Sequence, residues 1–246
     1  MLFPAPADGE PPVAVLVTTS GGLVAGDRLD IAVRVEAGAR AHVTASAAEK
    51  IYRSLGATAE ISQRLTVGAG AVLEFLPPET ILFDGARLRR KTVVELAERG
   101  AFLGGDIVVF GRRAGGERFT KGLLHETWEV WRDRRLVWGD ALHLDGDIPD
   151  TIADPACFDG AAGFATLILA PVGRDPREFI EGARAVQATA IANGMRAGAT
   201  VLAGLLIARW LAADTLALRG AFAALASRLR AEALALPPVL PRLWQV

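Results

Sequence analysis

The stretch that decides the fold is Leu29–Ser46, which reads LDIAVRVEAGARAHVTAS. Apolar residues alternate with polar or small ones from Leu29 to Val35, and this period of two predicts a β-strand with one buried face. Gly38 interrupts the pattern, because glycine accepts the backbone angles of a tight turn. A return strand is predicted from Ala41 to Ser46. The stretch therefore predicts a strand–turn–strand unit.

The same unit recurs twice further along the chain. The recurring strand patterns lie at residues 61–67, 72–76, 92–96 and 102–110. The turn glycines are Gly38, Gly70 and Gly100, so the spacings are 32 and 30 residues. A repeat of this length is typical of a stacked, solenoid-like array. We predict a mainly β, solenoid-like (β-helix-like) fold of stacked strand coils. The alternative is a β-sandwich whose hairpins share Gly-Ala turns.

The chain is expected to form a single domain, residues 1–246. Residues 1–12 are rich in proline and acid and are predicted to be a loose N-terminal arm. Residues 13–170 should hold the β-rich coils, and residues 171–246 the C-terminal strands and helices. Within these parts, a hairpin is predicted from 127–133 and 136–144, a loop at 145–159, and a buried strand pair or a helix at 201–211.

About two α-helices are expected in the C-terminal part. Asp175 and Pro176 precede Glu178, an order typical of a helix N-terminus, and this helix should run to about Val186. Asp214 can cap a second helix. Its apolar stripe recurs at helical spacing: Leu218, Phe222, Leu225 and Leu229.

Composition excludes several classes of partner and location. The formal net charge of −1 indicates neither a nucleic acid nor an anionic membrane as a partner. No apolar run reaches the ~18–20 residues that a membrane helix needs. Cys157 is the only cysteine, and the N-terminus lacks a signal-peptide pattern, so a cytoplasmic location is expected. The apolar share of 51% favours a surface covered by a partner protein, although an alanine-rich composition explains it nearly as well.

No residue pattern predicts a catalytic site or a tightly bound metal. The only histidines, His42, His125 and His143, have no other ligand at metal-binding spacing in the sequence. The glycines around Gly22 do not form a phosphate loop, because no Gly-Lys-Ser/Thr follows them. Carboxylates can line a passage for divalent cations, and a transient path is conceivable. Its candidate residues are Asp27, Glu49, Glu79 and Asp84.

Three polar segments follow the return strands at similar points of the repeat. They are Glu49–Arg53, Glu79–Asp84 and Arg112–Glu117. Stacked coils would bring them together at one end, whereas the alternative is three unrelated solvated loops. If they meet, Arg53 and Arg112 are expected to pair with Glu49 or Glu79 in bidentate fashion.

Four ordered segments resemble the urease accessory protein UreD family, also called UreH. They are Gly21–Leu29, Glu49–Ser54, Leu76–Phe83, and Phe110–Arg112 with Gly116–Glu117. The motif positions carried over from the family are Gly21, Gly22, Gly26, Asp27, Arg28, Lys50, Tyr52, Arg53, Thr80, Gly111 and Arg112. Pro241–Trp244 also resembles the family's tail. Three departures stand out: a shortened N-terminal strand region, Ala25 in place of Gly, and Pro78 in place of Gln.

The resemblance implies a β-rich solenoid-like fold and a non-catalytic chaperone role in nitrogen metabolism. Such a protein serves as a scaffold that joins the urease apoprotein to the UreF and UreG accessory proteins for nickel insertion. It holds no permanent cofactor, and nickel would pass only transiently. Two alternatives without this resemblance are a β-solenoid hydrolase that uses paired carboxylates and a plain structural β-repeat adaptor.

Overall fold

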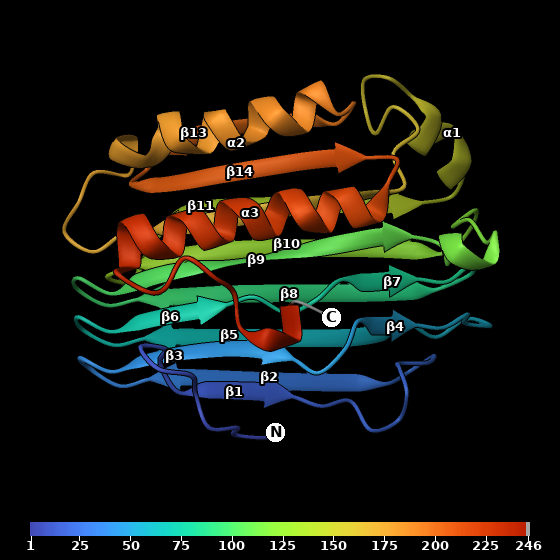
Figure 1. The fold of residues 1–246 in the computed structure, drawn as a ribbon. Helices are drawn as coiled ribbons and strands as arrows, with labels where there is room; N and C mark the ends of the chain where they lie inside the picture. The colour runs from blue at the N-terminus through green and yellow to red at the C-terminus, as the bar shows by residue number, and fades with distance from the viewer. Residues whose placement is uncertain (245–246) are drawn as a thin grey trace.

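The computed structural model describes residues 1–244 and consists of two β-sheets built from successive coils of the chain (Figure 1). In these residues the larger sheet has nine strands: β1 (Val13–Leu16), β3 (Arg40–Ala45), β4 (Glu49–Ile51), β6 (Val72–Phe75), β7 (Thr80–Leu82), β9 (Ala101–Phe110), β12 (Gly163–Ala170), β13 (Arg196–Leu202) and β14 (Leu205–Ala212). The smaller sheet has five: β2 (Arg28–Val35), β5 (Ala59–Val67), β8 (Arg87–Leu96), β10 (Leu123–Arg132) and β11 (Arg135–Asp145).

The coils stack through parallel pairing, which confirms the solenoid-like prediction. In the smaller sheet β2, β5 and β8 run parallel, and in the larger sheet β3, β6 and β9 do the same. The turns follow this order: Gly38 N donates to Ala69 O at 2.9 Å, and Gly70 N donates to Glu98 O at 3.1 Å. A sandwich of hairpins would give antiparallel neighbours instead, so that alternative is wrong.

The third turn differs by one residue from the spacing of the sequence repeat. Val72 is in register with Ala101, so the residue that stacks on Gly70 is Arg99 and not Gly100. Arg99 has a φ of +57°, in the same left-handed region as Gly70 at +64°. A side chain makes this backbone conformation costly, at about 1 kcal/mol or more. The third turn therefore keeps the left-handed backbone conformation of the second, although an arginine occupies that position and the glycine follows it.

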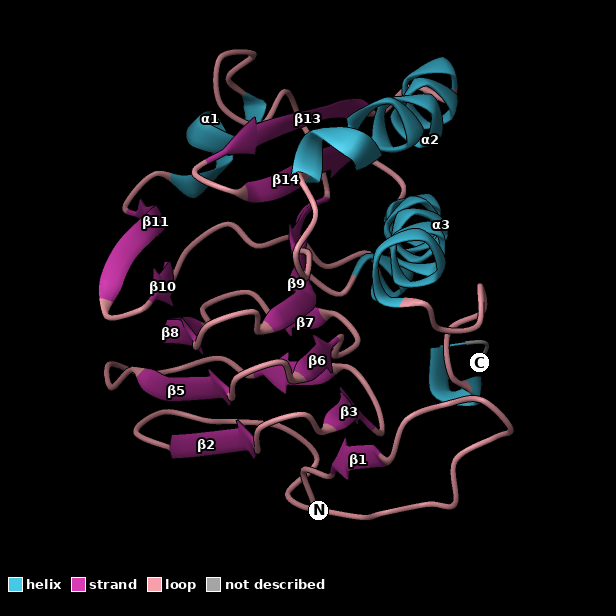
Figure 2. Ribbon diagram, turned by 90° about the vertical axis from the view of Figure 1, so that its left-hand side faces the viewer, coloured by secondary structure: helices cyan, strands magenta, loops and turns pink. Residues whose placement is uncertain are grey.

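The two long helices cover the outer face of the larger sheet, on the right of Figure 2. They are α2 (Ile180–Ala192) and α3 (Thr215–Leu234), the two C-terminal helices predicted. A third, α1 (Ile148–Ala153), lies in the segment expected to be a loop, and short 3₁₀ turns occupy Arg113–Gly115, Pro176–Phe179 and Arg242–Trp244. No helix among residues 1–244 has the length and apolar content that a membrane crossing needs.

The helix boundaries follow from their caps. The Asp175 side chain accepts from Arg177 N, and Glu178 returns the contact to the Asp175 backbone, which forms a capping box. The helix then continues to Ala192, beyond the predicted end at Val186. Asp214 accepts from the backbone of Leu216 and Ala217 at the start of α3. The predicted stripe of α3 is fully buried: Leu218, Phe222, Leu225 and Leu229.

The apolar core forms two layers, one between the sheets and one beneath the helices. Leu65, Leu73 and Phe102 belong to the inter-sheet layer, whereas Leu167 and Phe222 belong to the layer between the larger sheet and α3. Residues 201–211 form a strand pair, β13 with β14, which decides between the two alternatives for that segment.

The β10–β11 hairpin contains a bulge. Trp131 lies opposite Leu136, but Val130 lies opposite Trp138, so Val137 has no partner across the hairpin. Every pair farther from the turn is displaced by one residue relative to the register next to the turn. As a result His125 lies opposite His143. The displacement matters for the smaller sheet's outer face, because a shift of one residue exchanges the two faces of a strand.

Candidate functional site

The polar segments that follow the return strands lie side by side at one end of the coils. Glu49 is in register with Thr80, and Thr80 with Val108, so β4, β7 and the end of β9 are neighbours. Glu49 N also donates to Glu79 O at 2.9 Å. Stacking therefore gathers the residues that the sequence places far apart.

The first motif segment wraps onto the second through its backbone. Leu23 N donates to Lys50 O, and Tyr52 N donates to Leu23 O, both at 2.8 Å. A Cβ atom on Gly22 would lie 2.6 Å from Lys50 O, so only glycine permits this approach. The Tyr52 hydroxyl donates to Gly21 O at 3.2 Å, and its ring meets the edge of Phe83.

The other motif residues also hold loops in place. Gly26 has a φ of +82° in the turn that precedes Arg28, whose side chain pairs with Glu60 at 3.3 Å on the surface. Gly111 has a φ of +85°, and a Cβ there would lie 2.4 Å from Glu117 O. These contacts account for the motif glycines by close packing and turn geometry.

Arg53 and Arg112 do not pair with Glu49 or Glu79, and that expectation is wrong. Arg112 lies 3.7 Å from Glu117 and over the Phe83 ring, and Arg53 packs against Gly85. The partners differ because neighbouring residues in a strand face opposite sides. Glu79 faces α3, where it pairs with Arg219 at 3.0 Å.

Three of the four carboxylates in the predicted ion path are held separately by local partners. Asp27 accepts from Val24 N at 2.8 Å, and Glu79 pairs with Arg219. Asp84 accepts from the Thr120 backbone and hydroxyl. Although burial raises the pKa of Asp84, these hydrogen bonds outweigh it and the net pKa is lowered. Within residues 1–244 no three His, Cys, Asp or Glu side chains gather into a metal-binding group.

Glu49 also has a local partner, because its Oε2 accepts from the Thr18 hydroxyl at 2.7 Å, but its buried Oε1 has no partner in the described residues and the side chain lies near a charged cluster centred on Arg90. Arg90 donates to Glu126 at 2.8 Å, to the Thr80 hydroxyl at 2.8 Å and to Asp106 at 2.6 Å. The arginine is only 5% exposed and bridges from the smaller sheet to the larger one. We call Arg90, Asp106 and Glu126 the Arg90 cluster.

Carboxylate oxygens around Arg90 outnumber their hydrogen-bond donors. Glu126 Oε2, Asp106 Oδ1 and Glu49 Oε1 are buried and have no hydrogen-bond partner in the described residues. Burial raises the pKa of Glu126 well above its usual range, Arg90 opposes the shift, and Asp106 adds to it through its charge and through a hydrogen bond that the protonated Glu126 carboxyl donates. A cavity of about 150 Å³ is lined by residues that include Met1, Thr18, Glu49, Thr80 and Arg90.

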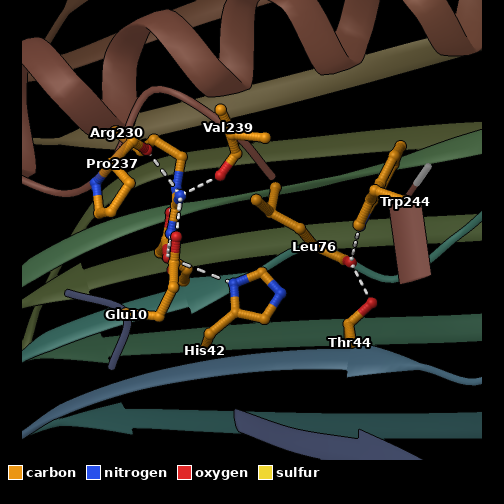
Figure 3. A network of polar contacts seen from close by, with 9 residues as sticks. Glu10, His42, Thr44, Leu76, Arg230, Pro237, Val239 and Trp244 are labelled. Atoms are coloured by element: carbon orange, nitrogen blue, oxygen red, sulfur yellow. Dashed lines mark hydrogen bonds and ion pairs between the residues drawn. The ribbon is translucent and has the colours of Figure 1, made fainter. Parts of the chain in front are cut away.

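A second buried arginine, Arg230 on α3, organises a different network (Figure 3). It donates to both carboxylate oxygens of Glu74, at 2.9 and 3.0 Å, and to both of Glu10, at 2.9 and 2.5 Å. It also donates to the carbonyl oxygens of Pro237 and Val239. We call this the Arg230 network. It attaches the N-terminal arm and the C-terminal segment to the larger sheet.

Histidine and tryptophan extend this attachment. His42 Nδ1 lies 3.2 Å from Glu74 Oε2, and Trp244 Nε1 donates to Leu76 O at 2.9 Å. Burial alone raises the pKa of Glu74, but hydrogen bonds from His42 and Arg230 more than offset it, and the net pKa is lowered. Leu2 also forms an antiparallel bridge with Val15. The arm expected to be loose is thus bonded to the fold at two places.

The sequence analysis did not predict either buried arginine, although the sequence of β9 contains one indication of the Arg90 cluster. Asp106 is the one charged residue in Phe102–Phe110, an otherwise apolar or glycine strand. A charge inside such a strand indicates a buried partner. Arg90 and Glu126 gave no comparable signal, because charged residues also alternate on solvated strand faces.

Comparison with known proteins identifies relatives over the whole chain. A family model described as UreD urease accessory protein matches residues 1–245. The chain is 44% identical to the urease accessory protein UreD of Magnetococcus marinus over 248 residues, which cover 100% of this chain and 85% of the relative. It is 40% identical to that of Granulibacter bethesdensis, with 99% of each chain covered.

A further relative, from Azorhizobium caulinodans, is 40% identical over 96% of this chain and 83% of its own length. These matches agree with the four ordered segments and with the stacked-coil fold. The chain belongs to the UreD urease accessory protein family, whose name supports a role in urease maturation.

Proposed function

We propose that this protein is a non-catalytic scaffold that joins the urease apoprotein to the UreF and UreG accessory proteins during nickel insertion. Family membership supports the maturation role, and the relatives' description as accessory proteins favours a role in organising another protein's chemistry. Nickel is a transient cargo in this proposal and not a resident cofactor. The free, exposed thiol of Cys157 supports a reducing compartment, the cytoplasm.

The observation that carries the cargo role is the excess of carboxylate around Arg90. Two carboxylates of the Arg90 cluster and Glu49 surround a single guanidinium, so the ionised group has a net negative charge. Partnerless carboxylate oxygens are suitable transient ligands for a divalent cation. Glu126, with its raised pKa, can exchange a proton as a cation enters or leaves.

The proposed path is narrower than the four carboxylates considered from the sequence. Glu49 lines the cavity that reaches Arg90, whereas Asp27 and Asp84 cap backbone groups and Glu79 faces α3. Only Glu49 is therefore retained as an entry residue. The other three are assigned structural roles.

Exposed apolar side chains support the partner role. Leu55 is 95% exposed, Leu216 77% and Phe3 74%. Apolar surface of this kind is covered in protein complexes. We expect the chain to aggregate more when expressed alone than with its accessory partners, and equal monodispersity in both conditions would contradict this expectation.

The test compares Glu49→Gln with Glu79→Gln in cells that co-express urease, UreF and UreG. The two substitutions are chemically identical, but Glu49 faces the cavity and Glu79 faces α3. Both variants should co-purify with the partners, while nickel content and activity of urease should fall only with Glu49→Gln. Normal nickel content with Glu49→Gln would contradict the path. Failure of the wild-type chain to co-purify with any urease component would contradict the scaffold role.

A further inference from the structure

The outer face of the smaller sheet carries a pair of histidines that the sequence analysis treated as isolated. His125 on β10 and His143 on β11 are register partners across the hairpin. Their Nδ1 atoms lie 3.1 Å apart, and the rings are inclined at 67°. The two histidines are 18 residues apart in the sequence, and only the fold brings them together.

The two Nδ1 atoms are directed at one another. A hydrogen bond between them requires one ring to donate a proton and the other to accept it through a lone pair. When the donor ring carries its proton on Nε2 instead, both Nδ1 lone pairs face the same small volume. Such an arrangement binds either one shared proton or one cation.

The separation suits a metal ion. Metal–nitrogen bonds of ~2.0–2.1 Å place two cis ligands about 2.9 Å apart at a right angle and about 3.4 Å apart in a tetrahedron. The observed 3.1 Å lies between these values. Neutral imidazole is a preferred ligand for zinc, copper and nickel.

The pair is open to solvent at an edge of the sheet. β11 is an edge strand, and His143 is exposed while His125 is half-buried. Charged residues on the same face include Arg87, Arg89 and Lys91 on β8, and Asp145 on β11. In the described residues no third His, Cys, Asp or Glu joins the pair to form a larger metal-binding group.

We propose that His125 and His143 form an open site for a divalent transition-metal ion of the zinc, nickel and copper group, bound through both Nδ1 atoms and completed by water. Two protein ligands make the site exchangeable, in contrast to closed structural sites with four. The site does not depend on the carboxylate route above, because it lies on the outer face of the smaller sheet and Glu49 lies on the inner side of the larger one.

The experiment titrates the purified full-length chain with Zn²⁺ and Ni²⁺ by calorimetry. The test variants are His125→Gln and His143→Gln, and the matched control is Thr127→Gln on the same face of β10. The wild-type chain and the control should bind one equivalent. Each test variant should bind more than about tenfold more weakly, because losing a direct ligand costs at least as much as losing a supporting one.

Long-range proton–nitrogen NMR spectra of the imidazole rings give a second measurement. Binding should shift the Nδ1 resonances of both histidines and leave that of buried His42 unchanged. Either of two results would overturn the proposal. One is the absence of any binding at millimolar metal, and the other is an affinity that both histidine variants leave unchanged.

Discussion

Arg90 and Arg230 are both buried arginines with two carboxylate partners, but their surroundings differ. Arg230 donates to two carboxylates and two carbonyl groups, and it connects segments as distant in sequence as Glu10 and Val239. Arg90 connects neighbouring strands, and carboxylate oxygens near it have no donor. All four carboxylate oxygens around Arg230 accept hydrogen bonds, although Nε2 of the neighbouring His42 is buried without a partner in the described residues. Satisfied carboxylates fix chain segments, whereas unsatisfied ones leave capacity for a ligand.

The strongest test of this difference between the two arginines is the substitution Arg230→Met. This change leaves the Glu74 and Glu10 carboxylates near one another without their cation, so the free energy of unfolding should fall by about 3–5 kcal/mol. Urea denaturation followed by tryptophan fluorescence measures the loss. Arg228→Ala on the same helix is the control, because its pair with Glu232 is partly exposed and should contribute below about 1 kcal/mol. Similar losses in both variants would refute the structural role of the Arg230 network.

Arg90→Met should destabilise the protein less, by about 2–3 kcal/mol. Glu126 has a raised pKa and can take up a proton when the guanidinium is removed, which relieves part of the cost of an unpaired charge. The same urea measurement applies, at neutral pH. A loss equal to or larger than that of Arg230→Met would show that the Arg90 cluster is as satisfied as the other network.

The two networks should also respond to pH in opposite directions. The raised native pKa of Glu126 contributes stability that is complete below about pH 4.3, the unfolded value, and is lost as pH rises through the native pKa. The lowered native pKa of Glu74 contributes stability that is present above about pH 4.3 and is lost as pH falls through the native pKa.

Glu126→Gln tests the first of these slopes. The variant should lose less stability than the wild-type chain between pH 5 and pH 9, by about 1.4 kcal/mol for each unit of pKa shift. Denaturation curves across this range measure the difference, with Glu60→Gln on the exposed surface as the control. Parallel pH profiles for wild type and Glu126→Gln would contradict the raised pKa.

The smallest effects are expected at the two glutamates of the end loops. Glu79→Gln weakens a half-buried pair with Arg219 and should cost about 1 kcal/mol. Glu49→Gln removes a charge whose buried oxygen has no donor, so stability should change by less than about 0.5 kcal/mol. The melting temperature distinguishes them, and a larger loss for Glu49→Gln would mean that this residue is a structural ion partner.

The coils could be predicted from the sequence because their signals are local. Alternation within Leu29–Val35 and the glycine turns each depend on a few adjacent residues. The shift from Gly100 to Arg99 could not be predicted, since it depends on the register between β6 and β9. Both residues lie in the turn between β8 and β9, where Arg99 is exposed and Gly100 is buried.

The buried sites were harder to predict because they depend on residues from different strands. Arg90, Asp106 and Glu126 come from β8, β9 and β10, and no short motif joins them. Glu49 was selected from the sequence together with Glu79, but Glu49 is in register with Thr80, so Glu79 is one residue out of step and faces α3 instead. Deciding which of the two glutamates lines the cavity required the register between β4 and β7.

One residue, Val137, determines how β11 of the β10–β11 hairpin tolerates insertions and deletions. Without the bulge that it forms, Val130 would lie opposite Val137. The rest of β11, from Val137 to its C-terminal end, would then be shifted by one residue relative to β10. In that arrangement His143, which is exposed in the structure, would face the core. Leu144, which is buried in the structure, would face water. A single-residue deletion at Val137 within β11 would therefore exchange the two faces of the strand beyond it, and related chains that lose Val137 should carry a compensating insertion within the same strand.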